Sequence, residues 1–496
     1  MSLSTTLNIA QSALSTNAAL STIVSRNIAG VNDPNYSTKT GVLETMLGGG
    51  VKLAGIRSST DTALFSNLLS ANSDAASASA LSDGLGTLEQ SLGLSNTTAT
   101  DGTSTDTSLA TLLGNMTNAL QQYAASPSNA TLGTAAVTAA KTLASNLNTA
   151  SATVQGVREQ ADSAMATSVA TINSLLGQFG AANTAVTNAT VAGTDATDAI
   201  DARNAILQSL SSQIGISTAD AGNGSLGIYT DGGATLFQGS ARTVAFTPTP
   251  GFSSSTVGGA VTVDGVAVTG ANATMASKSG KIAGLAQLRD TTAVAYGNQL
   301  DQIAHGLIAT FSESDQTGAG NPTIAGLFTN GSSSAIPTSA TGLAASLTVS
   351  AAVDPSQGGK VTLLRDGGIN AGTNTAYTAN STGAAGYSTQ LNALLTKLGT
   401  TQSFNPASGG VASGTLATYA SSSVSWLETT RQAASTTSTN KTALVTQTTT
   451  NLSSVTGVNL DEQLSKMLDL EHSYQASAEL MTTVKSMLDS LLSAVN

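Results

Sequence analysis

The sequence predicts a mainly α protein with β insertions: an elongated rod of long antiparallel helices, with N- and C-terminal helices paired as a coiled coil and β-rich outer parts. Three observations lead to this prediction. Apolar residues recur at helical spacing near both ends of the 496-residue chain. Only 3% of the residues are aromatic and 9% are charged. Helices rich in Ala and Leu bury less area per residue than an aromatic core, which favours extended helix contacts over one large globule.

The first expected helix ends in the stretch "NIAGVNDPNYSTK", which begins at Asn27. Gly30 is a natural C-cap, and Pro34 lacks the amide hydrogen that would continue the helix. Asn35 follows in the turn and tolerates a left-handed backbone better than most residues. The apolar seam of this helix comprises Leu3, Leu7, Ala10, Leu14, Val24 and Ile28.

The last expected helix has a continuous four-three spacing, which is typical of a coiled coil. Asn459 or Asp461 can cap its start. Val484 and Leu491 widen the apolar stripe, so this helix is expected to pack on more than one neighbour. The positions of the repeat are Leu460, Leu464, Met467, Glu471, Tyr474, Ala478, Met481, Lys485, Leu488, Leu492 and Val495.

The two terminal helices are interpreted as assembly elements. The alternative is that both belong to the core of one globular protein. Neither carries a Trp or Phe that would anchor it, so we expect them to be mobile in the monomer and ordered on assembly. The predicted assembly interface consists of Leu7, Leu14, Val24, Ile28, Leu460, Leu464, Met467, Tyr474, Met481 and Leu488.

Between the ends, the pattern changes from helix to sheet and back to helix. Helices are expected over residues 60–92, 108–126, 129–192, 198–214, 282–312, 388–398 and 416–454. Apolar and polar residues alternate around Asp-Gly turns in 224–248 and 259–272, which predicts hairpins. The Gly/Ser/Thr-rich part contains the strand-like pieces "SLTVSAAVD" and "GKVTLLRDGG".

These patterns divide the chain into four parts. A chain that leaves through helices, turns over in β structure and returns through helices has both termini at one end. The expected parts are a terminal assembly domain (1–60 and 450–496), a helical rod (61–215, 276–318 and 387–449), a β hairpin region (216–275) and a Gly/Ser/Thr-rich β-type outer insertion (319–386).

Composition argues against several classes of function. The net charge of -11 disfavours a nucleic-acid partner, because Lys and Arg supply most of that affinity. With no Cys, disulfides, Cys-ligated zinc and thiol nucleophiles are excluded. We find no apolar stretch long enough to cross a bilayer and no pattern of a cleaved signal peptide, so neither a membrane partner nor secretion by that route is expected.

Candidate catalytic and binding residues are few. His305 and His472 lie in helical patterns and are interpreted as ordinary helix residues. A weak G-x-G-x-x-G match, Gly222 to Gly227, is followed by a strand where a dinucleotide site needs a helix. Asp195, Asp198 and Asp201 at a helix start are better explained by capping and the helix dipole than by metal. No catalytic, cofactor or metal site is therefore predicted.

Several segments resemble flagellar axial proteins. "NIAGVNDPNYSTK" is similar to their Asn-Ile-Ala-Asn-x-x-x-Pro-Gly-Tyr-Ser segment, and "GVNLDEQLSKMLDLEHSYQASAELMTTVKSMLDSLL" resembles their shared C-terminal helix. The internal stretches "DARNAILQSLSSQIGIS" and "SGKIAGLAQLRDTTAVAYGNQLDQIAHGL" narrow the resemblance to the hook-associated family of the hook–filament junction. The departures are Gly30 and Val31 for Asn and Ala, Asn35 for Gly, and Asn204 for Asp.

The resemblance implies a structural protein, not an enzyme, that joins hook to filament in the bacterial flagellum. Such proteins are exported through the type III route, lie outside the cell and polymerise through their terminal helices. The implied partners are further copies of the chain in a ring, the hook protein, a second junction protein and a cytoplasmic export chaperone on the C-terminal helix. The alternatives are a hook or distal-rod protein, where Tyr36-Ser37 is usually Phe-Lys, and a secreted adhesin or enzyme using the β insertion.

Overall fold

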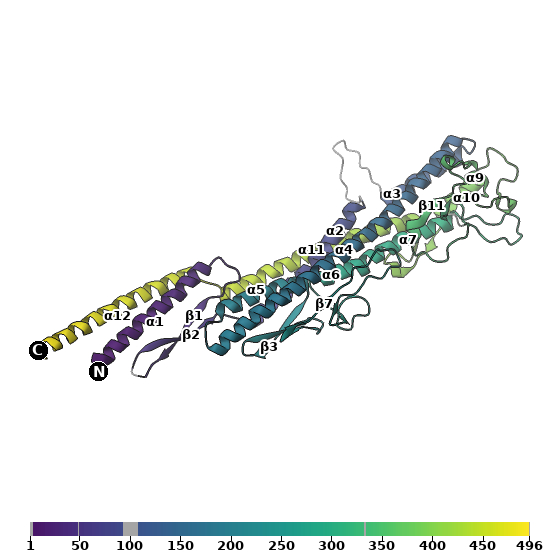
Figure 1. Cartoon of the computed structure of the whole chain (residues 1–496). Coiled ribbons are helices and arrows are strands. Elements are labelled where there is room, and N and C mark those ends of the chain that lie inside the picture. Colours follow the sequence, from purple (N-terminus) through teal and green to yellow (C-terminus); the bar gives the residue numbers. More distant parts are fainter. Residues whose placement is uncertain (1–2, 48, 93–107, 332–333, 496) are drawn as a thin grey trace.

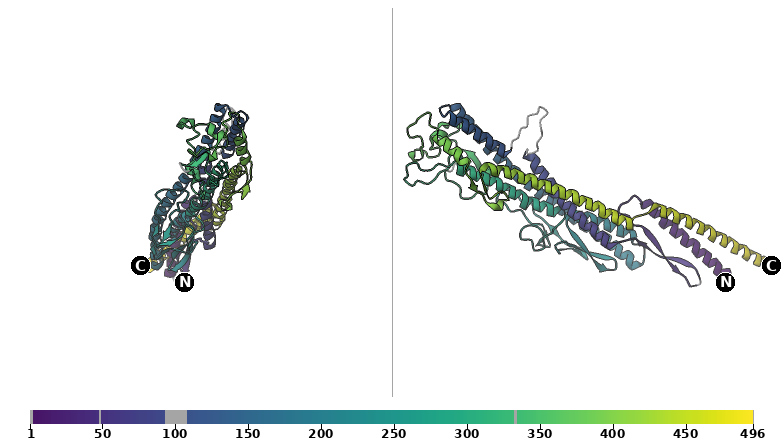
Figure 2. Two further views of the ribbon diagram at one scale, coloured as in Figure 1. Left: turned by 90° about the vertical axis from the view of Figure 1, so that its right-hand side faces the viewer. Right: turned by 180° about the vertical axis from the view of Figure 1, so that it is seen from behind.

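The computed structural model describes residues 3–47, 49–92, 108–331 and 334–495. The chain forms an elongated helical rod, and α1 begins at the same end of this rod at which α12 finishes (Figure 1). This confirms the predicted fold class. Figure 2 shows the rod nearly end-on in its left view, where the outline is compact, and elongated again from behind in its right view.

The helices agree closely with the periodicity of the sequence. Pro127 follows the end of α3, and a five-residue π-turn, Leu288–Thr292, connects α6 to α7. The helices are α1 (Leu3–Gly30), α2 (Thr62–Ser91), α3 (Leu109–Ala125), α4 (Ala130–Ala192), α5 (Thr197–Gln213), α6 (Lys281–Gln287), α7 (Ala293–Thr310), α8 (Leu343–Ser346), α9 (Thr362–Asp366), α10 (Thr389–Leu398), α11 (Leu416–Thr456) and α12 (Leu460–Val495).

The strands pair antiparallel in small separate sheets. Asp264 and Gly265 connect β8 to β9 with positive φ angles of 47° and 84°, as the Asp-Gly hairpin predicts. The strands are β1 (Lys39–Thr45), β2 (Val51–Ser58), β3 (Ile216–Gly222), β4 (Ser225–Thr230), β5 (Thr235–Gln238), β6 (Ser240–Ala241), β7 (Val244–Ala245), β8 (Thr262–Val263), β9 (Val266–Ala267), β10 (Phe328–Asn330), β11 (Leu347–Val349), β12 (Gln402–Ser403) and β13 (Ser413–Gly414).

The helix α4 is the central element of the rod, and α3, α5 and α7 pack along it. The Oδ1 atom of Asn129 accepts a hydrogen bond from the Thr131 amide (3.0 Å) and caps its start. Gly193, with a φ of 67°, ends the helix in the left-handed conformation that glycine favours. The buried side chains of α4, such as Leu147 and Ile172, belong to a core that extends along the rod.

A buried ionic cluster holds the middle of the rod together. Arg289, on the π-turn, pairs with Asp162 of α4 and binds Asp290 through Nε (2.9 Å) and Nη2 (2.8 Å). Arg158 donates to the Arg289 carbonyl oxygen (2.9 Å). Arg158, Asp162 and Arg289 are all buried. Their partners in the protein therefore have to replace the hydrogen bonds to water that each charge has lost.

The strand prediction for the outer insertion is largely wrong. "GKVTLLRDGG" contains the helix α9, with Leu364 and Arg365 buried on one side. "SLTVSAAVD" contains the three-residue strand β11 and then turns. The β-branched residues suggested strands, but packing against α4 and α10 overrides that local preference.

The helix α1 ends at Gly30 and a turn follows, as expected, but neither Gly30 nor Asn35 has the left-handed backbone that such ends often have. Gly30 is still helical and does not have a positive φ; it is needed because a Cβ atom there would lie 2.6 Å from Cγ of the Tyr36 ring. Asn35 likewise does not adopt the left-handed conformation. Asp33 shapes this turn instead, since its Oδ1 accepts the Asn35 amide (2.9 Å).

Candidate assembly interface and its joint to the rod

One end of the molecule is a thin arm, which we define as α1, α12 and the hairpin β1–β2. The helices α1 and α12 lie antiparallel, as predicted, and the hairpin packs against α1 (Figure 1). Sequence analysis did not identify this hairpin, although apolar and polar residues alternate in Val51–Ser58. Leu43 and Leu47 of the hairpin are exposed. No helix among the described residues is long and apolar enough to cross a membrane.

The face of α12 that contacts α1 is mostly polar. Asn17 of α1 donates to Ser473 Oγ (2.9 Å). The buried residues of α12 are Gln463, Ser477 and Val484, which lie at one position of the heptad repeat. Two of these three side chains are polar, and none of the three is a position of the apolar repeat that the sequence pattern suggested.

The predicted interface residues of α12 lie mainly outside this seam. Leu464 is 45% exposed and Leu488 is 36% exposed, and Leu460, Met467 and Tyr474 are also exposed. Met481 is partly buried. The predicted residues of α1 are better covered: Val24 is buried, and Leu7, Leu14 and Ile28 are partly buried. We call the exposed apolar side chains of α12 the outer face; it also includes Leu468, Leu480, Met487, Leu491 and Leu492.

A groove runs between the two helices next to the outer face. Its volume is about 580 Å³. Asn17, Ala18 and Ser21 line it on the α1 side, and the α12 side carries Met467, Leu470, Glu471, Tyr474 and Gln475. One wall is therefore small and polar while the other is long and largely apolar. A third helix placed here would find apolar side chains to cover and room for its own.

Asn27 connects three segments where the arm meets the rod. Its Nδ2 donates to Gln463 Oε1 of α12 (2.9 Å) and to the Lys39 carbonyl oxygen (2.9 Å), and its Oδ1 accepts the Lys39 amide (2.9 Å). The Tyr36 hydroxyl also donates to Oδ1 (3.0 Å). Burial raises the pKa of Tyr36 to about 12, so its hydroxyl stays a donor. The first residue of the quoted stretch thus fixes both the end of α1 and the start of α12.

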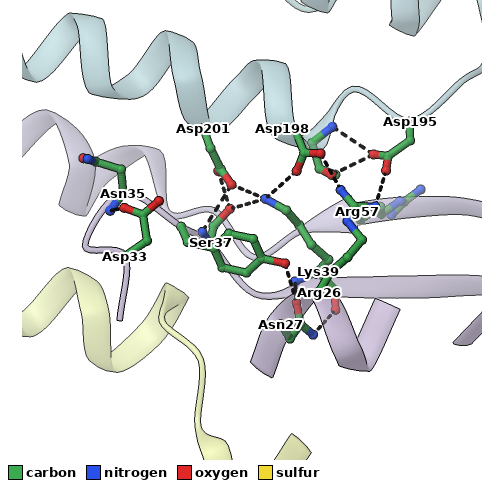
Figure 3. A network of polar contacts seen from close by, with 12 residues as sticks. Arg26, Asn27, Asp33, Asn35, Ser37, Lys39, Arg57, Asp195, Asp198 and Asp201 are labelled. Carbon is green, nitrogen blue, oxygen red and sulfur yellow. Dashed lines mark hydrogen bonds and ion pairs between the residues drawn. The ribbon is translucent and has the colours of Figure 1, made fainter. Parts of the chain in front are cut away.

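The arm is fastened to α5 by ionic contacts (Figure 3). Arg26 donates to Asp195 (2.8 Å) and Asp198 (2.7 Å), and the fully buried Lys39 pairs with Asp201. The Asp195 bond is the main cause that raises the pKa of Arg26 above its usual value. Burial alone would raise the pKa of Asp195, but hydrogen bonds from Arg26 and Thr197 outweigh it and the pKa falls.

These three aspartates were predicted to cap a helix, and only part of that is confirmed. Asp195 Oδ1 accepts the Thr197 amide (2.9 Å) at the start of α5. Asp198 and Asp201 instead bind cations of the arm, more than 150 residues away in the chain. Their spacing places them on one helix face, but no local pattern names the partner. Among the described residues, no group of acidic residues and histidines could hold a metal ion.

The backbone at the joint carries additional contacts between the arm and α11. The Thr38 amide donates to the Thr456 carbonyl oxygen (2.8 Å), and the Thr38 hydroxyl donates to the Gly457 carbonyl oxygen (2.6 Å). Asn459 Oδ1 accepts the Glu462 amide (3.2 Å), which confirms the first of the two predicted caps for α12. The entering and returning chains are therefore tied together where the rod ends.

Two family models match the chain. Residues 453–494 match the flagellar basal body rod FlgEFG protein C-terminal domain, which includes α12. The C-terminal part of the chain is therefore similar to the C-terminal domain of flagellar rod proteins. Residues 98–327 match the flagellar hook-associated protein FlgK helical domain, and together the two matches support a FlgK-type hook-associated protein. This family is one of structural proteins.

The solved structures that are similar to the chain include the flagellar hook junction protein FlgK from Burkholderia pseudomallei. The sequence identity is 22% and the TM-score is 0.43. The alignment covers 54% of this chain and 47% of that protein, so the chain spans about half of its relative's length. No curated protein matches the chain.

Proposed function

We propose that this chain is the adaptor that joins hook to filament at the flagellar junction, and that it polymerises through its arm after type III export. One observation carries the proposal: the outer face of α12 consists of exposed large apolar side chains outside the contact with α1. The match of this region to an axial-protein domain, and of the rod to a hook-associated helical domain, supports it.

Burial of the outer face would supply the free energy of assembly. Each large aliphatic side chain that leaves water contributes about 1.5–3 kcal/mol. Leu464, Leu488 and their neighbours would therefore stabilise a ring of arms strongly once adjacent arms cover them. The groove of α1 and α12 gives a neighbouring helix a place to lie. In the isolated monomer the arm buries much less apolar surface, because the seam between α1 and α12 is largely polar.

The expected partners are the molecules that would cover the outer face of α12. In the extracellular flagellum these are further copies of the chain, the hook protein on one side and a second junction protein on the other. Before export, the outer face would need protection from water and from aggregation. A cytoplasmic export chaperone on α12 would provide this protection.

A pair of substitutions tests the proposal. Leu464→Glu with Leu488→Glu places charge on the outer face and should abolish attached filaments and swimming. Leu444→Glu is the matched control: Leu444 is 43% exposed but lies on α11 in the rod, and that variant should assemble. Circular dichroism should find both variants folded. Normal filaments from the double variant would contradict the proposal.

Deletion of residues 460–496 tests the same idea more coarsely. The truncated chain should keep a folded rod and lose assembly.

Hydrogen exchange on the intact monomer should be fast in α1 and α12 and slow in α4, because the arm is covered on one side only. Equal protection in the arm and in α4 would mean that the terminal helices are ordinary core.

A further inference from the structure

Two charged residues interrupt the apolar repeat of α12. Glu471 stands between Met467 and Tyr474 in this repeat, and Lys485 occupies the equivalent position two heptads later. Both side chains are exposed, and Glu471 lines the groove between α1 and α12. The two positions are fourteen residues apart, which is about 21 Å along a helix. The outer face therefore presents one negative and one positive charge at a fixed separation.

Neither charge is neutralised by an ion pair within the described part of the monomer. The salt bridge that the described residues of α12 form joins Lys466 to Glu462 (2.6 Å), and it includes neither Glu471 nor Lys485. Glu471 accepts a long hydrogen bond (3.5 Å) from the side-chain amide of Gln475, which carries no charge. Both charges therefore depend on water for their stabilisation.

Covering the outer face would take both charges out of water. The loss of hydration is unfavourable for an ion unless a counter-ion replaces it. The rod shows how this chain meets that requirement, because Asp162 lies in the buried stripe of α4 and pairs with Arg289 of another element. The fully buried Lys39 pairs with Asp201 of α5 in the same way. A partner that covers α12 therefore has to bring an opposite charge to each position.

The terminal helices of a second copy do not supply these charges. The helix α1 carries no charged side chain before Arg26, which is bound to Asp195 and Asp198. Two α12 helices packed in parallel and in register would place Glu471 against Glu471, and a shift of two heptads would place it against Lys485. That shifted contact uses the same face on both helices, so it cannot be repeated around a ring of copies.

We propose that the outer face of α12 binds a helix of a different protein, which presents a cationic side chain to Glu471 and an anionic side chain to Lys485. Apolar residues of that helix cover Met467, Tyr474 and Leu488. Charged pairs inside an apolar seam fix the register of the two helices, because any shift leaves both charges unpaired. The inference rests on the proposed function, since it names the kind of partner that covers the outer face.

Single charge reversals in the whole chain test the two contacts. Glu471→Lys and Lys485→Glu should each leave about tenfold fewer cells with attached filaments, because each reversal brings two like charges together. Glu479→Lys is the matched control: Glu479 is an exposed acidic residue of α12 outside the repeat, and that variant should assemble. Circular dichroism of the purified variants should match that of the parent chain. Normal filaments from either reversal would overturn the proposal.

Exchanging the two charges identifies where their counter-charges come from. Glu471→Lys combined with Lys485→Glu keeps the composition and net charge of the chain, but it mismatches both contacts with a different protein. The double variant should therefore assemble no better than either single variant. Filaments at the level of the parent chain would show that the two charges meet each other between copies, and would overturn the assignment to a different protein.

Selection for restored swimming in the Glu471→Lys strain tests the same assignment from the side of the partner. The expected second-site change replaces a basic residue by an acidic one in a helix of another protein of the flagellum. Restoration by second-site changes within this chain alone would overturn the assignment.

These outcomes are separate from the test of the proposed function. If Leu464→Glu with Leu488→Glu fails to assemble while the charge reversals assemble normally, this inference is refuted and the function stands. Assembly by that leucine variant would refute the function itself.

Discussion

The helices α4 and α12 have the same kind of apolar stripe and opposite surroundings. In α4, Leu147 and Ile172 are completely buried, because α3, α5 and α7 surround the helix. In α12, Leu464 and Leu488 remain exposed, because α1 contacts the helix along a different, polar face. The stripe of α4 is covered within the molecule, whereas most of the stripe of α12 is exposed.

This difference shows that an apolar repeat can be covered by the same chain or left exposed by it. Periodicity predicts that a helix has one apolar face, but it does not say whether the cover comes from the same chain. Gln463 and Ser477, which face α1, weaken the pairing within the monomer and leave the apolar residues available. A stable rod with a marginal arm is the arrangement expected of a subunit that must remain soluble before it assembles.

The largest effect on monomer stability should come from truncating matched leucines in the two helices. Leu147→Ala removes a fully buried side chain and should lower the free energy of unfolding by about 3–5 kcal/mol, through lost burial and a cavity. Leu488→Ala should leave it unchanged and weaken assembly instead. Urea unfolding followed by circular dichroism measures the first effect, and polymerisation measures the second. Equal destabilisation by both variants would remove the distinction between rod and arm.

The buried ionic cluster should be the next most sensitive feature. Asp162→Asn leaves Arg289 buried with Asp290 alone, which should cost about 3 kcal/mol of unfolding free energy. The measurement is again urea unfolding. Asp489→Asn on the exposed surface of α12 makes the same chemical change in the arm and should not alter the midpoint. If Asp162→Asn also left the unfolding midpoint unchanged, the stability of the rod would not depend on the ion pair of Asp162 with Arg289.

A pH dependence should arise in the rod from Glu313. Burial raises the pKa of this carboxyl to about 7, although the Ile369 amide, which donates to Oε2 (2.9 Å), acts in the opposite direction. The folded state therefore holds a proton that the unfolded state releases near pH 4.5. Stability should be greatest below that pH and should fall by about 2–3 kcal/mol as the pH rises through 7.

Glu313→Gln should abolish most of this slope between pH 5 and 8 in urea unfolding. Glu159→Gln, on the exposed side of α4, should leave the slope in place. Hydrogen exchange near Ile369 should quicken at high pH in the parent chain, while the exchange of α12 amides, corrected for their intrinsic rates, should not change. A slope that survives in Glu313→Gln would assign the titration to another group.

The sequence predicted the helices well because their signals are local. Asn129 caps α4, Gly193 ends it, and Asn459 caps α12, each through contacts within a few residues. The hairpin turn at Asp264 has the same origin, since the two-residue loop requires positive φ angles. Elements defined by their own caps and turns can be identified without knowledge of their neighbours.

Features that depend on distant residues could not be predicted. No pattern pairs Arg26 with Asp198, or shows that Asn27 connects α1 to Gln463. The heptad spacing of α12 likewise does not say which of its apolar positions face α1 and which face another molecule. Under the proposed function these positions would face outward, so periodicity alone does not identify what covers them.

The smallest effect should come from the contacts that join arm to rod. Arg26 is partly exposed, so Arg26→Gln should cost only about 0.5–1 kcal/mol, and 1 M salt should reduce that difference further. Hydrogen exchange should quicken at the end of α1 and the start of α5 and stay unchanged in α4. Lys52→Gln is the matched control, because Lys52 pairs with Glu44 (3.1 Å) within the hairpin. If both variants behaved alike, the buried contacts of Asn27 and Lys39 would hold the joint without Arg26.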